Sequence, residues 1–160
     1  MKKILISLLA VLSVGTIIYF SLNRKTEQPV RSVDTSQLFE VIMSEPVTSS
    51  TTADYLRIHE TEYQQLLDDE AGTLDYIFTE FLSAEESGNG LNDLRGVLLW
   101  TLLDELAPEA RVNQPIALAQ QYFDAWRTQA VEMQKANGND WLKENQPAMY
   151  QLLEKLAKHS

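Results

Sequence analysis

The sequence predicts an all-α protein with an N-terminal transmembrane helix, a polar stalk and a compact bundle of about four to six helices. Three observations predict this class. An uncharged apolar run occupies residues 4–22. From residue 53 onward, apolar residues recur at the three- and four-residue spacing of amphipathic helices. No segment combines alternating polarity with β-branched residues, the pattern that is typical of a strand.

The apolar run predicts a membrane anchor. Residues 4–22 contain no charge and lie between basic pairs at residues 2–3 and 24–25. A helix of this length spans about 28 Å, close to the roughly 30 Å of bilayer hydrocarbon. A cleaved signal peptide is the alternative, but its best small-x-small motif, residues 13–15, would leave an apolar new N-terminus. We therefore expect residues 1–25 to be an uncleaved signal anchor that contacts the lipid bilayer through residues 4–22.

The charge distribution indicates where the rest of the chain lies and what it binds. Of the 13 Lys and Arg residues, four lie within residues 1–25, whereas all 23 Asp and Glu residues lie beyond, so residues 26–160 carry a formal charge of −14. This balance argues against nucleic-acid binding and favours a basic or neutral protein partner. The basic N-terminus favours a single-pass protein of the cell membrane with an extracytoplasmic C-terminal domain.

Residues 26–52 have the composition of a polar stalk. They are rich in Ser, Thr, Pro and Glu, and their apolar positions are sparse. One short amphipathic patch, residues 37–43, interrupts this pattern. Two interpretations of the patch remain open, because it is either a first helix that docks on the domain or an isolated helical turn near the membrane.

The helical domain is expected to cover residues 53–160. Its first helix begins near Ala53 and is ended by Gly72, and its apolar face comprises Tyr55, His59, Tyr63, Leu66 and Leu67. Thr73 caps the second helix, whose apolar face spans residues 76–82. The sequence Ser-Gly-Asn-Gly at residues 87–90 predicts the loop that follows.

The third helix is the expected centre of the core. It begins at Asn92 or Asp93 and runs through residues 94–106, which are apolar nearly all round. Gly96 predicts the close approach of a neighbouring helix. A fourth helix is expected from Pro115 to Asn137, followed by a short turn after residue 140 and a last helix from residue 147.

Part of this pattern resembles a known kind of domain. The residues that show this pattern are Tyr63-Gln64-Gln65-Leu66-Leu67, Leu74-Asp75-Tyr76-Ile77-Phe78, Gly90-Leu91, Gly96 to Leu106 and Phe123-Asp124-Ala125-Trp126. They resemble a HEAT-like helical-hairpin domain of uncharacterised exported or membrane-anchored proteins of Gram-positive bacteria. The resemblance implies a fold and an exported location, and it implies no activity.

No motif in the chain predicts catalysis, a cofactor or a metal. His59 and Glu62, three residues apart, supply only two potential zinc ligands, and the competing interpretation is a boundary histidine bonded to a neighbouring carboxylate. Residues 68–70 are consecutive acids that cannot share one helix face, which is typical of a solvated surface. The glycine patterns of phosphate-binding and nucleophile loops are absent from the sequence. We therefore expect no enzyme.

Two aromatic residues are the candidate interface residues. Trp141 follows a loop, and Tyr122 is adjacent to Phe123, so the side chains of this pair point about 100° apart and one of them is expected to be exposed. Exposed aromatics with a polar surround are enriched at protein interfaces. Trp141 and Tyr122 are therefore predicted to contact a partner.

These observations favour a membrane-anchored acidic helical module that binds a protein at the cell envelope and has no catalytic activity. One version is an immunity-type protein that captures a toxin, since acidic charge accelerates the capture of a basic partner. A structural self-assembling envelope protein is an alternative. Another is a carboxylate- or metal-dependent envelope hydrolase, for which residues 62, 104 and 105 are the first acids to inspect.

Overall fold

The computed structural model describes residues 34–44 and 51–159. All of them belong to one compact unit of the chain. The predicted anchor, residues 4–22, lies outside the described residues, as does most of the stalk. In the part of the chain that the structure describes, no helix is both long and apolar enough to cross a membrane.

The described residues are all-helical, which confirms the all-α prediction. The α-helices are α2 (Thr35–Ser44), α3 (Thr52–Ile58), α4 (Glu60–Asp68), α5 (Glu70–Glu86), α6 (Leu94–Leu106), α7 (Ala119–Asn137), α8 (Asn139–Asn145) and α9 (Pro147–His159). A short 3₁₀ helix, η1, spans Pro108–Ala110. Residues 34–44 and 51–159 contain no strand.

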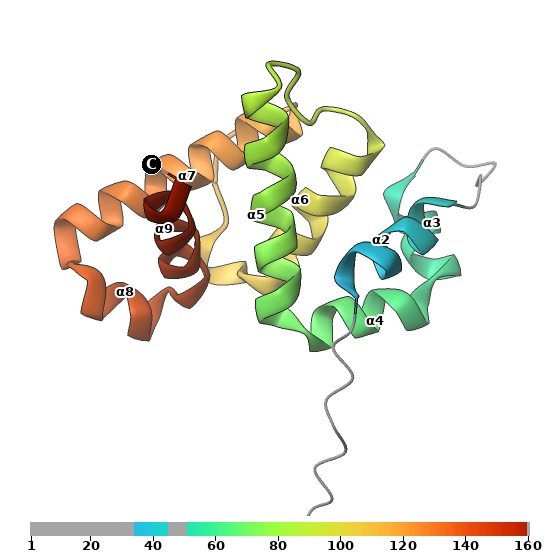
Figure 1. Ribbon diagram of the computed structural model, residues 1–160, viewed down its shortest axis with the longest axis horizontal. Helices are drawn as coiled ribbons and strands as arrows, with labels where there is room; N and C mark the ends of the chain where they lie inside the picture. Colours follow the sequence, from blue (N-terminus) through green and yellow to red (C-terminus); the bar gives the residue numbers. More distant parts are fainter. Residues whose placement is uncertain (1–33, 45–50, 160) are drawn as a thin grey trace, which may run out of the picture. The chain divides into compact units, whose positions relative to one another are not determined.

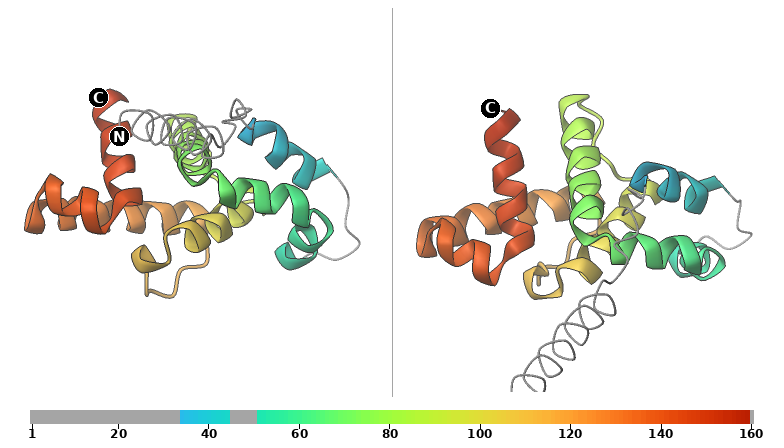
Figure 2. Two further views of the ribbon diagram at one scale, coloured as in Figure 1. Left: turned by 90° about the horizontal axis from the view of Figure 1, so that it is seen from below. Right: turned by 60° about the horizontal axis from the view of Figure 1, so that its bottom comes forward.

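Helix α5 is the element around which the others pack. It contacts α2 and α4 on one side and α9 on the other, and it lies beside α6, with which it forms a helical hairpin. Helix α6 continues this packing through contacts with α7, while α7, α8 and α9 contact one another (Figure 1, Figure 2). The centre of the core comes from apolar residues of these helices, including Phe78, Phe81, Leu99, Phe123 and Trp126, each at 0% exposure.

Helix α2 docks on the rest of the unit through the amphipathic patch at residues 37–43. Phe39 and Ile42 are each 1% exposed, and α2 packs against α3, α4 and α5. Of the two interpretations that the sequence left open, the structure therefore selects the docked helix. The helical unit also reaches at least to Thr35, N-terminal of the boundary predicted at residue 53.

The start of the domain differs from the prediction because the expected first helix is divided. Helix α3 ends at Ile58, because the backbone of His59 leaves the helical region (φ −108°, ψ 39°), and α4 ends at Asp68, before Asp69. Gly72 is not a stop: the Asp69 carboxylate accepts a hydrogen bond from the Gly72 amide and caps α5. Thr73 is correspondingly buried inside α5, where its hydroxyl donates to the Leu66 carbonyl at 2.6 Å. The described residues therefore hold more helices than predicted.

The fourth predicted helix begins later than expected. Helix α7 starts at Ala119 rather than Pro115, and its first turn is fixed from the α5–α6 side of the fold. The Gln120 amide donates to the Asn92 side chain at 3.1 Å, and the Gln120 side chain accepts from the Leu91 amide at 3.1 Å. These bonds satisfy a free amide of the helix start, so the tertiary contact selects the boundary.

The beginning of α6 follows the prediction. The Asp93 carboxylate caps the helix by accepting from the Gly96 amide at 3.1 Å. Gly96 is buried, and a Cβ atom there would clash with the carbonyl oxygen of Leu91 and lie 3.1 Å from the Cβ of Ala119 on α7. The close approach predicted from Gly96 therefore exists, although the nearest neighbour is the preceding loop rather than a helix.

Candidate functional site

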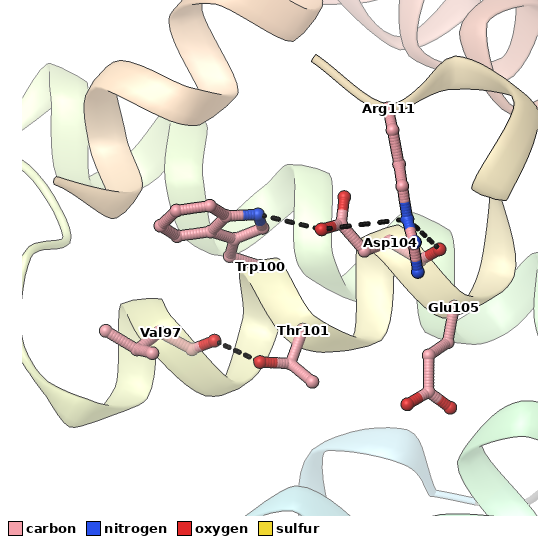
Figure 3. Close-up of a pocket in the computed structure, with 6 residues that line it drawn as sticks. All are labelled: Val97, Trp100, Thr101, Asp104, Glu105 and Arg111. Atoms are coloured by element: carbon pink, nitrogen blue, oxygen red, sulfur yellow. Dashed lines mark hydrogen bonds and ion pairs between the residues drawn. The ribbon is translucent and has the colours of Figure 1, made fainter. Parts of the chain in front are cut away.

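The candidate site is a pocket of about 310 Å³ beside the second half of α6 (Figure 3). Its lining residues are Val97, Trp100, Thr101, Asp104, Glu105 and Arg111. Five of the six come from α6 at spacings of three and four residues, so the helix places them along one strip of its surface. Arg111 reaches the strip because η1 turns the chain back after α6.

Asp104 organises one side of the pocket. Its carboxylate accepts a hydrogen bond from the indole Nε1 of Trp100 at 3.1 Å and another from the hydroxyl of Tyr122 on α7. Arg111 donates from Nε to the backbone carbonyl of Asp104 at 3.3 Å and lies 3.9 Å from its carboxylate. Figure 3 shows Trp100 and Arg111 turned toward this carboxylate. Asp104 thus holds the orientation of its neighbours.

The indole of Trp100 is stacked on Tyr122. The two ring centroids are 4.4 Å apart and the rings are inclined by 20°. Burial, and then the hydrogen bond to Asp104, raise the pKa of Tyr122 to about 12. The Tyr122 hydroxyl also accepts from the Val112 amide at 3.2 Å, so this side chain links α6, α7 and the segment between them.

Glu105 differs from Asp104 in its surroundings. Its side chain is exposed and points away from Asp104 and Arg111 in Figure 3. Among the residues that the structure describes, Glu105 forms no ion pair, and the hydroxyl of Tyr63 on α4 is one of its polar neighbours. Burial raises the pKa of Tyr63 and the nearby Glu105 carboxylate raises it further, although the two groups do not meet the geometry of a hydrogen bond. Glu105 is therefore the carboxylate of this pocket that is available to a ligand.

The structure separates the two candidate interface residues. Trp141 on α8 is 38% exposed and lies between the exposed acids Asp140 and Glu144 in the sequence. Tyr122 is only 2% exposed, and Phe123 is fully buried. The expectation that one of this pair is exposed was wrong, because Trp100 covers the Tyr122 ring while its hydroxyl is used by Asp104. Trp141 stays a predicted interface residue.

His59 and the acids at residues 62 and 68–70, which the sequence analysis also considered, do not line this pocket. His59 is 8% exposed, and its Nδ1 lies 3.9 Å from the Glu62 carboxylate. Asp68 accepts a hydrogen bond from Gln64, and Asp69 caps α5. Within residues 34–44 and 51–159, no group of three or more His, Asp or Glu side chains could hold a metal ion. The structure brings Asp104 and Glu105 to the pocket, and Glu62 is not among the lining residues.

Of the six lining residues, sequence reasoning singled out only Asp104 and Glu105, and the most important omissions are Trp100 and Arg111. Trp100 was assigned to the core because it lies in an apolar helix, and Arg111 was not considered. The spacing of Trp100 and Asp104, four residues apart on one helix, was the available signal for the first. The position of Arg111 depends on the turn at η1, and the only sequence signal for that turn is Pro108.

Comparison with known proteins adds no family to this description. No protein-family model matches the chain, and neither a curated protein nor a solved structure is significantly similar to it.

Proposed function

We propose that this chain is a membrane-anchored acidic module that binds a basic protein at the cell envelope and catalyses no reaction. Residues 4–22 are its proposed anchor, and the C-terminal helical unit is its proposed extracytoplasmic, HEAT-like binding domain. The partner is recognised by charge and by exposed aromatic side chains, with Trp141 as one contact. A toxin captured by an immunity-type protein is one partner of this chemistry.

The observation that supports the proposal most strongly is which charged side chains form ion pairs within the unit and which do not. Arg95, Arg111, Arg127 and Lys155 each pair with at least one carboxylate inside the unit. Exposed acids such as Glu60, Glu70, Glu86, Glu109 and Glu132 form no ion pair within the described residues. Within the described residues, five of the eight Lys and Arg side chains are thus paired, counting Arg57 with Asp54, and Lys135, Lys143 and Lys158 form no ion pair. The exposed acids outnumber these three lysines, so the surface stays negative. Such a surface attracts a positively charged partner and raises the rate of encounter.

The pocket chemistry supports binding more than catalysis. Each carboxylate oxygen of Asp104 accepts a hydrogen bond, one from Trp100 and one from Tyr122, so this group already orients neighbouring side chains of the protein. A hydrolase would require a nucleophile or an activated water beside a second acid or a metal. Here the aromatic and acidic side chains converge on a surface pocket, an arrangement suited to holding another protein's side chain.

The test is crosslinking of the full-length chain in the cells that produce it, followed by affinity capture. We expect one abundant basic protein, recovered in near-equal amount, whose recovery falls steeply as salt is raised during binding. A variant with Glu60, Glu70 and Glu109 changed to Lys should lose most of this recovery. A matched variant with the same residues changed to Asp keeps the charge and should retain it. Self-crosslinks alone would contradict the proposal and support a self-assembling envelope protein.

A further inference from the structure

We propose that the pocket beside Trp100 binds an arginine side chain of the partner protein, with the indole as its aromatic wall and Glu105 as its carboxylate partner. This inference rests on the proposed function, because it identifies the group by which a basic partner is recognised. It names a binding site within the acidic surface. The aromatic wall of the pocket, a carboxylate that forms no ion pair within the described residues, and the size of the pocket all favour this ligand.

Trp100 forms a rigid aromatic wall. Tyr122 covers one face of the indole, at a centroid distance of 4.4 Å, and Asp104 fixes the indole nitrogen at 3.1 Å. Tyr122 does not line the pocket, so Trp100 presents to it the parts of the indole that the stack leaves uncovered. Since the side chain is already immobilised, a ligand that contacts it loses little additional entropy. Tryptophan is also the aromatic side chain that attracts cations most strongly.

The charge of the pocket selects a cation. Two carboxylates and one guanidinium line it, and Arg111 is held by both the carboxylate and the backbone carbonyl of Asp104. Arg111 is therefore paired with Asp104, and with Glu105 the lining carries a formal net charge of −1. Glu105 is left without an ion pair in the part of the chain that the structure describes, and it is exposed. An incoming cation gains a charge-assisted hydrogen bond at Glu105.

The size and shape of the site favour arginine over other cations. A pocket of about 310 Å³ lies at the lower end of the range for ligand sites, which suits a single side chain. A guanidinium is planar, stacks on aromatic rings and presents a fork of donors to a carboxylate. A lysine ammonium offers a point charge without stacking, so it should bind the same pocket more weakly.

The experiment follows the three indole N–H signals of the ¹⁵N-labelled full-length chain in detergent micelles. The probe is a Gly-Arg-Gly tripeptide with blocked ends, and the matched control replaces arginine by citrulline, which is nearly isosteric and neutral. Tryptophan-to-phenylalanine variants assign the signals. We expect a saturable shift of the Trp100 signal with the arginine peptide and at least about fivefold weaker binding of the citrulline peptide. The Trp126 signal should stay in place.

Two variants make the result decisive. Glu105→Gln preserves shape and should weaken binding of the arginine peptide about five- to tenfold. Glu109→Gln removes an exposed acid just after α6 that does not line the pocket, and it should leave the binding unchanged. Equal binding of both peptides, no saturable shift, or an equal effect of both variants would overturn the inference. If the arginine peptide does not bind but the partner from cells is still captured in a salt-dependent manner, the arginine site is wrong and the proposed function is retained.

Discussion

Arg95 on α6 lies over the aromatic ring of Phe39 on α2, with its guanidinium carbon 5.1 Å from the ring centroid. The same guanidinium donates to Glu40 on α2 and to Glu80 on α5, each at 2.7 Å, and to the Tyr76 hydroxyl. One side chain thus joins three helices. It also attaches α2, the first described helix after the predicted anchor in the sequence, to the rest of the unit.

Replacing Arg95 should loosen α2. Arg95→Met keeps most of the aliphatic stem and removes every charge-assisted bond, so we expect a loss of about 1–3 kcal/mol in the free energy of unfolding. Chemical denaturation measures this loss, and hydrogen exchange should show faster exchange of the amides in α2. Arg57→Met is the control, because Arg57 is largely exposed and has one ion pair at 3.6 Å, so its effect should stay below about 0.5 kcal/mol. Equal effects of the two variants would contradict the role of Arg95.

Raising the pH above 10 should destabilise the folded unit. The folded-state pKa of Tyr122 is about 12, above the ordinary value of 10, because burial and Asp104 favour the neutral phenol. The unfolded chain therefore loses its proton first as pH rises. The stabilising contribution is complete below pH 10 and is lost as pH rises toward the folded-state pKa. Tyr76, whose pKa burial also raises to about 12, adds to the effect.

Denaturation curves at pH 9, 10, 11 and 12 measure this dependence. Each such tyrosine contributes up to about 1.4 kcal/mol per pH unit between its two pKa values. Tyr122→Phe should be less stable than the wild type at pH 9, since it removes the hydroxyl that donates to one carboxylate oxygen of Asp104, and it should lose less stability on further increase of pH. A pH slope identical to that of the wild type would contradict the assignment.

Gly96 should resist substitution although it lies in a helix. Alanine is normally favoured over glycine there by about 1 kcal/mol. At Gly96 the added Cβ would meet the Leu91 carbonyl oxygen and crowd Ala119, so we expect Gly96→Ala to destabilise the unit by about 1–3 kcal/mol. Thermal unfolding gives the measurement. The control Ser83→Ala, at an exposed position of α5, should be neutral or slightly stabilising, and a stabilised Gly96→Ala would contradict the packing at this contact.

Trp141 and Trp126 should respond in opposite ways to truncation. Trp126 is fully buried and packs against Phe78, so Trp126→Ala should cost about 3–5 kcal/mol of stability. Trp141 is 38% exposed, so Trp141→Ala should cost less than about 1 kcal/mol and should instead reduce capture of the partner. Unfolding curves and capture yields from the same variants test both statements. Unchanged capture by Trp141→Ala would remove this residue from the interface.

The sequence was sufficient where local chemistry decides the structure. The apolar residues of α5 and α6 predicted the core, Asp93 predicted the start of α6, and Gly96 predicted a close contact. The patch at residues 37–43 was recognised as helical in character. Its docking was left open, because that depends on Arg95, which is more than 50 residues away and meets Glu40 only in the folded chain.

The errors have the same physical origin. Helix α7 begins at Ala119 because Asn92 and Leu91 bond to Gln120, and no local signal near Pro115 reports this contact. Tyr122 is buried because Trp100 and Asp104, on another helix, use its ring and hydroxyl. The pocket likewise depends on Arg111 folding back along α6. Tertiary contacts therefore determined both the misplaced boundaries and most of the candidate site.

Recognition of a basic partner by the acidic unit can be measured by quantitative crosslinking capture in the producing cells, at low and at high salt. The full-length wild type is compared with Glu105→Gln and Glu109→Gln at equal expression. We expect the wild type to recover one basic protein in near-equal amount, Glu105→Gln to reduce the yield, and Glu109→Gln to leave it unchanged. Recovery of self-crosslinks alone, or of a partner whose yield does not depend on salt, would contradict this expectation.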